Sequence, residues 1–523
     1  MTSLTEVSQE LNDAFRHVSD DLKEGAFYRH PNDLSIVTSH RFEWLTALQG
    51  RLDSEAYVPR AATGLSVPKA EWHVRPAAIL TLEDHTVYNY LALLARAQVG
   101  PQLSWSEKKT IRFSNHIKLR GRRWFRPSFV GWKAFDRLSL RRMKKKTHVL
   151  VTDIAGYYEN IDIGRLVQDL RAVGVESAVV NLLTACLNKW AGRRGKGIPQ
   201  GYSASALFAE FYLNTVDQAL ETEGLDHMRY LDDFRIFAES KPAAIRALHR
   251  LSELVREHGL NLQTAKSQIL RAEEARERFS AVDRVLSAVS GRIGSQLKGL
   301  IGADPYVTPR ALRAYIRSDP ADPAPAVVET AWQEFEAGTF GPFSKSVFHY
   351  LLSRLSELKS RVAMPFVLEQ LLEKPEETGY CLDYLEALDD AAKPEEIDQV
   401  AMMLTDGRSI YEYQRYLVLR WFVERRVGNA RVLRFCRRLL SDSAAPSLLL
   451  PCAAAYLGEL SEGLQDYERL ESALYRDSDA VTRAAYLCAL RPAPRAWRNR
   501  VLGRVAGEST YLDWAIECAK QEV

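Results

Sequence analysis

The chain is organised around the stretch Arg229-Tyr-Leu-Asp-Asp-Phe-Arg-Ile-Phe237, in which two adjacent acids, Asp232 and Asp233, separate two short apolar and aromatic runs. Such runs predict two β-strands, so we expect both acids in the tight turn of a β-hairpin. Neighbouring carboxylates repel and raise each other's pKa, and a divalent cation would relieve that repulsion. A simply solvated acidic turn is the alternative for these acids taken alone.

A third acid, Asp153, ends the β-branched run that starts at Val149. The run predicts a strand with Asp153 at its C-terminal end. If this strand is an antiparallel neighbour of the hairpin, Asp153 lies beside Asp232. Three carboxylates that meet in this way can hold two Mg2+ ions about 3.5–4 Å apart, which stabilise the attacking and leaving oxygens of phosphoryl transfer.

Four segments, in this order along the chain, resemble the palm motifs A, B, C and D of the reverse transcriptases. They are Asp153-Ile-Ala-Gly-Tyr-Tyr158, Ile198-Pro-Gln-Gly201, Tyr230-Leu-Asp-Asp233 and Gly259-Leu-Asn-Leu-Gln-Thr-Ala-Lys266. The resemblance implies a polymerase that uses dNTPs and two Mg2+ ions. The implied metal ligands are Asp153, Ile154, Asp232 and Asp233, and the implied catalytic residues are Asp153, Asp232, Asp233 and Lys266. Lys266 is expected on a short strand, where it could protonate the pyrophosphate leaving group or be an ordinary surface lysine.

The same resemblance implies a nucleotide site. Its candidates are Lys69 and Arg75 in a fingers-like segment, Tyr158 in motif A, and Gln200 and Gly201 in motif B. A point charge and a planar guanidinium suit the oxygens of a triphosphate. Tyr158 would exclude a 2′-hydroxyl and so select deoxynucleotides. The alternatives are surface cations beside a turn and tyrosines that belong to the core.

Basic residues are concentrated before motif A. Between Trp105 and Lys146 the chain has fifteen Lys or Arg and two acids, whereas the whole chain has a net charge of +3. Aromatic residues alternate with these cations, a pattern that favours phosphate contacts and stacking of unpaired bases. The candidates for contact with single-stranded nucleic acid are Arg120, Arg122, Arg123, Trp124 and Arg126. The alternative is a solvated basic face over an aromatic core.

Composition narrows the class of protein. The chain has 523 residues, of which 46% are hydrophobic and 26% are charged, as expected for two or three globular domains. The first residues lack the pattern of a signal peptide, and there is no run of about 18 apolar residues, so we expect a cytoplasmic protein with no membrane contact. Six scattered cysteines without Cys-x-x-Cys spacing predict reduced core residues rather than disulfides or a zinc site.

The chain is predicted to be an α+β protein in three parts. Residues 1–280 are expected to form reverse-transcriptase-like fingers and palm with N-terminal helices, and residues 281–340 a Pro-rich transition with short, broken extended structure. In residues 341–523, helical periods of hydrophobic residues alternate with Pro and Gly breakers, which predicts an irregular, HEAT-like α-helical repeat.

A palm followed by a long helical array resembles the abortive-infection group of bacterial defence reverse transcriptases. The resemblance implies a homo-oligomeric DNA polymerase of anti-phage defence, whose single-stranded DNA product is made in some members without a template and primed by a tyrosine of the protein. Two alternatives stay open. One is a templated reverse transcriptase that copies a dedicated noncoding RNA, and the other is a non-catalytic scaffold that binds RNA.

Overall fold

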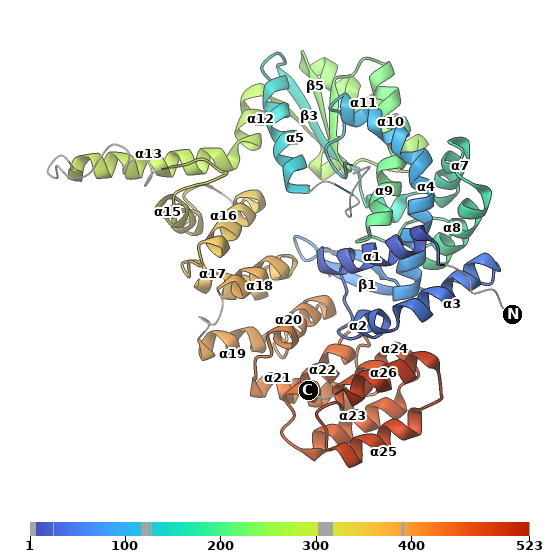
Figure 1. Cartoon of the computed structure of the whole chain (residues 1–523). Coiled ribbons are helices and arrows are strands. Elements are labelled where there is room, and N and C mark those ends of the chain that lie inside the picture. The colour runs from blue at the N-terminus through green and yellow to red at the C-terminus, as the bar shows by residue number, and fades with distance from the viewer. Residues whose placement is uncertain are drawn as a thin grey trace. The chain divides into compact units, whose positions relative to one another are not determined.

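The computed structural model describes residues 7–24, 26–116, 125, 128–301, 317–341, 343–388 and 393–521 (Figure 1). The chain divides into two compact units. The first comprises Met1–Arg29, Val37–Leu65 and Pro76–Phe279, and the second comprises His30–Ile36, Ser66–Arg75 and Ser280–Val523. We call them the sheet unit and the helical unit.

The sheet unit is built around four antiparallel strands in the spatial order β4-β5-β3-β6. They are β3 (His148–Asp153), β4 (His227–Tyr230), β5 (Asp233–Ala238) and β6 (Gln268–Arg271). The register of β3 on β5 runs from His148 opposite Ala238 to Asp153 opposite Asp233. The strand that was predicted to end at Asp153 is therefore present and central in the sheet.

Both faces of this sheet are covered by helices. Val149 and Val151 of β3 lie in an apolar cluster with Phe135 of α5 (Ser128–Arg142) and Phe279 of α12 (Ala272–Phe279). On the other face, α11 (Lys241–Glu257) packs on β3 and β5. Alternate side chains of a strand point to opposite faces, so a strand buried on both faces needs the nearly continuous apolar run that β3 has.

The other elements of the sheet unit are a β-hairpin and a group of helices. A hairpin is formed by β1 (Thr63–Pro68) and β2 (Val74–Ile79), whose tip residues belong to the helical unit. The helices are α1 (Gln9–Glu24), α3 (Arg41–Asp53), α4 (Leu82–Lys108), α6 (Tyr157–Asn160), α7 (Ile163–Ala172), α8 (Ser177–Trp190), α9 (Ser203–Tyr212) and α10 (Asn214–Thr222). A further helix, α2 (Asp33–Ser39), is divided between the two units after Ile36. Helix α4 packs against α1, α8 and α9.

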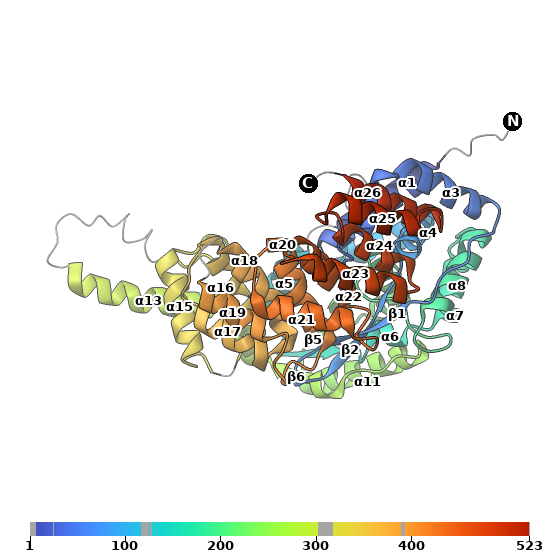
Figure 2. The same cartoon turned by 90° about the horizontal axis from the view of Figure 1, so that it is seen from below.

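From Ser280 onward every element in the described residues is helical, which confirms the predicted α+β class with a helical C-terminal region. The helices are α13 (Ala281–Ile301), α15 (Pro325–Glu336), α16 (Lys345–Glu357), α17 (Met364–Glu373), α18 (Thr378–Ala387), α19 (Pro394–Met402), α20 (Glu412–Arg425), α21 (Ala430–Ser441), α22 (Leu450–Glu459), α23 (Leu464–Arg476), α24 (Ala480–Ala489), α25 (Arg495–Val505) and α26 (Thr510–Lys520). Alternate helices pack in succession, α16 on α18 and so on to α26, as the yellow-to-red part of Figure 2 shows. The predicted boundaries at residues 280 and 340 stay predictions.

Two short segments from the first part of the chain belong to the helical unit. The Tyr511 hydroxyl on α26 donates a hydrogen bond of 2.6 Å to Asp33. The Tyr411 hydroxyl, just before α20, donates one of 2.7 Å to the backbone carbonyl of Trp72. The helical unit is thus completed by residues that precede it by several hundred positions.

The region after residue 280 differs from the prediction. Residues Ala281–Ile301 form the 21-residue helix α13, where broken extended structure was expected. Apolar residues at helical spacing, such as Val285, Leu286 and Val289, are buried there, and this periodicity outweighs the Pro residues further on.

The cysteines of the described residues are all free, and four of the six are buried, in agreement with the prediction. None of the helices in the described ranges is long and apolar enough to cross a membrane.

Candidate active site

The strand register brings the three predicted acids together at one end of the sheet. Asp153, the last residue of β3, lies directly opposite Asp233, the first residue of β5. Tyr230 also pairs with Asp233, so the turn between β4 and β5 consists of Leu231 and Asp232. The prediction that both acids occupy the turn was therefore wrong by one residue, because Asp233 is the first residue of β5. The prediction that Asp153 lies beside Asp232 is confirmed, since the two side chains interact directly. A two-residue turn is the commonest hairpin connection, and the pairing of Tyr230 with Asp233 makes Leu231 and Asp232 its two residues.

Burial and mutual repulsion perturb these carboxyl groups. Burial, together with the charges of Asp153 and Asp233, raises the pKa of Asp232 to about 8. Burial and the charge of Asp153 raise the pKa of Asp233 to about 6, although Lys266 opposes the shift. Negative charge is therefore only partly compensated here, and carboxylate oxygens are the ligands that Mg2+ prefers.

These acids fit a divalent cation by their chemistry, but they do not form a ready-made metal cage. No group of three or more His, Cys, Asp or Glu side chains in the described residues has the arrangement of a metal site. The Asp153 carboxylate accepts a hydrogen bond from the Lys266 ammonium group. The side chain of Ile154 is apolar and buried, so only its backbone oxygen could be a ligand.

Lys266 lies in a 3-10 turn, Thr264–Lys266, rather than on the predicted strand, because β6 begins only at Gln268. The turn is fastened to β3 by the Gln263 N–H, which donates to the Asp153 carbonyl at 2.7 Å. Burial lowers the pKa of Lys266, but its hydrogen bond to Asp153 and the neighbouring acids raise the pKa overall. The structure thus places a charged ammonium group at the acids.

The motif B loop is bonded to motif A through the backbone. The Ile198 N–H donates to the Tyr158 carbonyl at 3.0 Å, and Gln200 follows in the same loop with a half-buried side chain. Gly201 has φ +96°, and a Cβ atom there would come within 2.7 Å of the Phe27 ring. Backbone conformation and packing therefore both require glycine at this position.

The two tyrosines of motif A have different environments. Tyr157 is 3% exposed, and its hydroxyl donates to the Ala209 carbonyl. Tyr158 is half-buried, with its ring centroid 5.7 Å from that of Tyr157. Tyr157 is thus a core residue, whereas the role of Tyr158 in excluding a 2′-hydroxyl stays a prediction.

Helix α9 follows motif B, and neither Ser203 nor Ser205 caps it. The residue that precedes the helix is Tyr202, which makes no side-chain cap bond. Ser203 instead donates to the buried carboxylate of Asp21 at 2.5 Å, and Ser205 shares a 2.7 Å hydrogen bond with Tyr88. Both serines therefore attach α9 to helices α1 and α4.

The remaining predicted residues stay predictions. Lys69 is exposed and Arg75 half-buried on the β1–β2 hairpin, within a segment that belongs to the helical unit. The predicted nucleic-acid contacts Arg120, Arg122, Arg123, Trp124 and Arg126 lie outside the described residues. Within the described part of the basic stretch, Trp132 of α5 is 37% exposed and packs edge-on against Tyr230, with ring centroids 4.8 Å apart.

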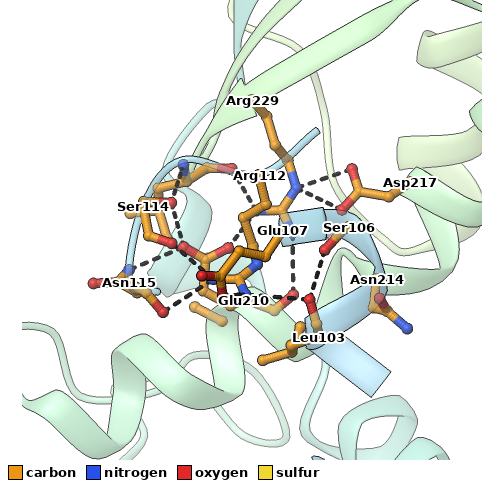
Figure 3. A network of polar contacts seen from close by, with 12 residues as sticks. Leu103, Ser106, Glu107, Arg112, Ser114, Asn115, Glu210, Asn214, Asp217 and Arg229 are labelled. Atoms are coloured by element: carbon orange, nitrogen blue, oxygen red, sulfur yellow. Dashed lines mark hydrogen bonds and ion pairs between the residues drawn. The ribbon is translucent and has the colours of Figure 1, made fainter. Parts of the chain in front are cut away.

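Sequence reasoning missed a buried group of charged residues behind the acidic turn (Figure 3). Its centre is Arg229, which is completely buried and ion-paired with Glu210 of α9 and Asp217 of α10. Arg112 is also completely buried nearby. One signal was available, because Glu210 interrupts an otherwise apolar helix, and a buried acid needs a partner.

The sequence and the fold were compared with known proteins. Residues 67–288 match the family model described as "Reverse transcriptase (RNA-dependent DNA polymerase)". No curated protein matches the sequence.

Solved structures resemble the fold at low identity. They include telomerase from Candida albicans in complex with a fragment of telomeric RNA (12% identity, TM-score 0.32, 70% of this chain and 66% of that one). They also include a partial Cas6-RT-Cas1–Cas2 complex (16% identity, TM-score 0.28, 48% and 40%) and apo telomerase from Candida tropicalis (10% identity, TM-score 0.29, 91% and 74%). The chain therefore covers less than two thirds of the length of the first two.

Proposed function

We propose that the chain, which carries a reverse transcriptase domain in residues 67–288, is a nucleotidyltransferase that synthesises DNA at Asp153, Asp232 and Asp233. The observation that carries this proposal is the register that sets Asp153 opposite Asp233 and next to the Asp232 turn. Carboxylates this close together repel and lower the stability of the fold unless cations neutralise them. Three acids at one place therefore indicate a functional site.

The residues of the chain have separable roles in this reaction. Asp153, Asp232 and Asp233 would hold divalent cations, which supply positive charge to the oxygens of the reacting phosphate. The ammonium group of Lys266, which donates to Asp153, is placed to give a proton to the departing pyrophosphate. The loop around Gln200, bonded to Tyr158, would hold the base and sugar of the dNTP.

The finer proposal is DNA synthesis in anti-phage defence, as implied by the resemblance to the abortive-infection reverse transcriptases. It is supported by the combination of the reverse transcriptase domain with a long helical region. In that group a homo-oligomer and a protein-linked product are expected. A priming hydroxyl must be exposed, which favours Tyr380 (47% exposed) and Tyr475 (45%) in the helical unit.

The activity test is incorporation of labelled dNTPs by the purified chain with Mg2+, with and without added RNA or DNA. Incorporation that is lost with EDTA supports the polymerase, and its absence under every condition contradicts it. Synthesis without added nucleic acid favours the untemplated reaction, whereas a strict need for one bound RNA favours the templated alternative. Product that stays attached to protein after denaturation, until protease is added, supports protein priming.

A further inference from the structure

We propose that four buried residues, Arg229, Glu210, Asp217 and Ser114, are positioning residues that hold the acidic turn in its metal-binding conformation. We call them the Arg229 cluster. The inference rests on the proposed function, because it concerns how the turn that carries Asp232 is kept in place. None of the four would touch the substrate; they act through the backbone of Leu231 and the strand that leads to it.

Arg229 connects the turn to two acids. Its Nε donates to both oxygens of Asp217, at 3.0 and 2.8 Å, and its Nη1 donates to Glu210 at 2.5 Å. The same Nη1 also donates to the backbone carbonyl of Leu231 at 3.0 Å. All three charged side chains are completely buried. A planar guanidinium makes such a set of bonds in one geometry only, so the carbonyl of the turn is held in a fixed direction.

Ser114 holds the other polar group of the same residue. The Leu231 N–H donates to the Ser114 hydroxyl at 2.7 Å, and that hydroxyl in turn donates to the Glu210 carboxylate. Both backbone polar groups of Leu231 are therefore bonded to the cluster. These bonds converge on Leu231, the turn residue directly before Asp232.

Leu231 needs such support because its backbone is in the left-handed region, with φ +57°. A two-residue hairpin turn of this kind favours Gly, Asn or Asp at that position, whereas a leucine there is strained. Strain of this sort persists only where the surroundings determine the conformation, and it is common at functional sites. The hydrogen bonds of the Arg229 cluster to Leu231 hold its backbone in this conformation.

The cluster also joins the turn to the nucleotide loop. Glu210 lies on α9, whose first residue, Ser203, is two positions after Gly201 and three after Gln200. Helix α9 is attached at its start to Asp21 and near its end to Arg229. One rigid helix therefore relates the candidate nucleotide residues to the candidate metal residue Asp232.

A purely structural role is the competing explanation, and a pair of matched serine substitutions separates the two. Ser114→Ala removes the hydroxyl that bridges Leu231 and Glu210. Ser139→Ala is the control, because Ser139 is equally buried in the same unit, accepts from Arg235 at 2.8 Å and donates to a backbone carbonyl at 2.8 Å. Both variants lose one buried bridging hydroxyl, so similar losses of thermal stability are expected.

The readouts are Mn2+ binding followed by electron paramagnetic resonance, and the kcat and KM for dNTP. We expect Ser114→Ala to weaken Mn2+ binding and lower kcat, each about tenfold, the size of effect of one lost buried hydrogen bond, with KM for dNTP changed less than about twofold. Ser139→Ala should change neither. Equal effects of the two substitutions, or normal Mn2+ binding by Ser114→Ala, would overturn the proposal.

Arg229→Lys gives a stronger version of the test, since lysine keeps the charge but cannot donate to Asp217, Glu210 and Leu231 together. It should weaken Mn2+ binding more than Ser114→Ala does, and Mn2+ binding equal to that of the wild type would count against the proposal. If Arg229→Lys does not fold, the serine pair still decides. A wild-type chain that incorporates no dNTP would refute only the proposed function, because Mn2+ binding is measured without turnover.

Discussion

The sheet unit and the helical unit differ in how deeply their ion pairs are buried. Behind the acidic turn, the ion pairs of Arg229 with Glu210 and Asp217 are completely buried. In the helical unit a typical pair, Arg431 with Asp398, has side chains that are 33% and 47% exposed. Burying ions costs solvation free energy that their attraction only partly restores. The difference indicates that ion pairs are completely buried where they fix the geometry of the acidic turn. In the helical unit, alternate helices pack mainly through apolar side chains.

The largest expected effect concerns the acids themselves. Asp232→Asn should lower dNTP incorporation by at least about 1000-fold, because the loss of a metal ligand removes several kcal/mol of transition-state stabilisation. Incorporation rates of the variant and of the wild type measure this directly. Asp226→Asn, which disturbs an ion pair with Arg142 elsewhere in the unit, is the control and should retain activity. Near-normal incorporation by Asp232→Asn would end the polymerase proposal.

The same substitution should stabilise the fold. Because the folded-state pKa of Asp232 is raised to about 8, ionisation of this group weakens the fold between pH 4 and pH 8. In metal-free buffer at pH 8, Asp232→Asn should therefore raise Tm by about 2–4 °C, the effect of 1 kcal/mol on a domain of this size. At pH 4 the gain should vanish, which calorimetry at the two pH values will show.

The next effect tests the comparison itself. Asp217→Asn removes one of the two buried acidic partners of Arg229 and should lower the free energy of unfolding by about 3–5 kcal/mol. Asp398→Asn removes a half-exposed partner of Arg431 and should cost at most about 1 kcal/mol. Urea unfolding of both variants measures the difference. Similar losses in the two units would break the contrast between buried and half-exposed pairs.

A smaller effect is expected at the tyrosines of motif A. Tyr158→Ala should lower the preference for deoxynucleotides about 10- to 100-fold, because a ring that could collide with the 2′-hydroxyl is removed. Tyr157→Phe is the control, since it removes only the hydroxyl that donates to Ala209. Competition between labelled dNTP and rNTP reports the ratio. If Tyr158→Ala discriminates between dNTP and rNTP as the wild type does, another residue selects the sugar.

The smallest effect comes from an exception in the helical unit. Glu377 is 1% exposed and pairs with His349 and Lys345. Burial raises its pKa, but the bonds from His349 and Lys345 outweigh burial and lower it overall. Its contribution to stability is therefore present above the ordinary pKa of about 4.5 and lost as the pH falls through the lower folded value. Glu377→Gln should cost about 1–2 kcal/mol at pH 7 and less at pH 3.5, as urea unfolding at each pH will show. An equal cost at both pH values would contradict the pairing.

The elements that could be predicted are those that local pattern determines. The strand ending at Asp153 follows from its β-branched residues. Helix α11 follows from the helical spacing of apolar residues such as Ala244, Ala247 and Leu251. Their register could not be predicted, because a shift of one residue changes which acid faces Asp153, and local patterns do not report pairing across strands. The 3-10 turn at Lys266 was missed for a similar reason, since it depends on the bond from Gln263 to β3.

The positioning residues were beyond local reasoning altogether. Ser114, Glu210, Asp217 and Arg229 meet only after four separate segments have folded. Arg229 directly precedes motif C, but the sequence does not indicate its partners. The serines after Gly201 also depend on tertiary contacts. Serine at the start of a helix often caps it, but Ser203 and Ser205 instead bond to Asp21 and Tyr88.

The hydrogen bond between Tyr511 and Asp33 has a consequence for synthesis on the ribosome. The two residues are 478 positions apart. At about 5–20 residues per second, the segment around Asp33 is made roughly 25 to 95 s before its partner. The helical unit can therefore be completed only after translation is nearly finished, and a chain released before residue 511 leaves Asp33 without this hydrogen bond.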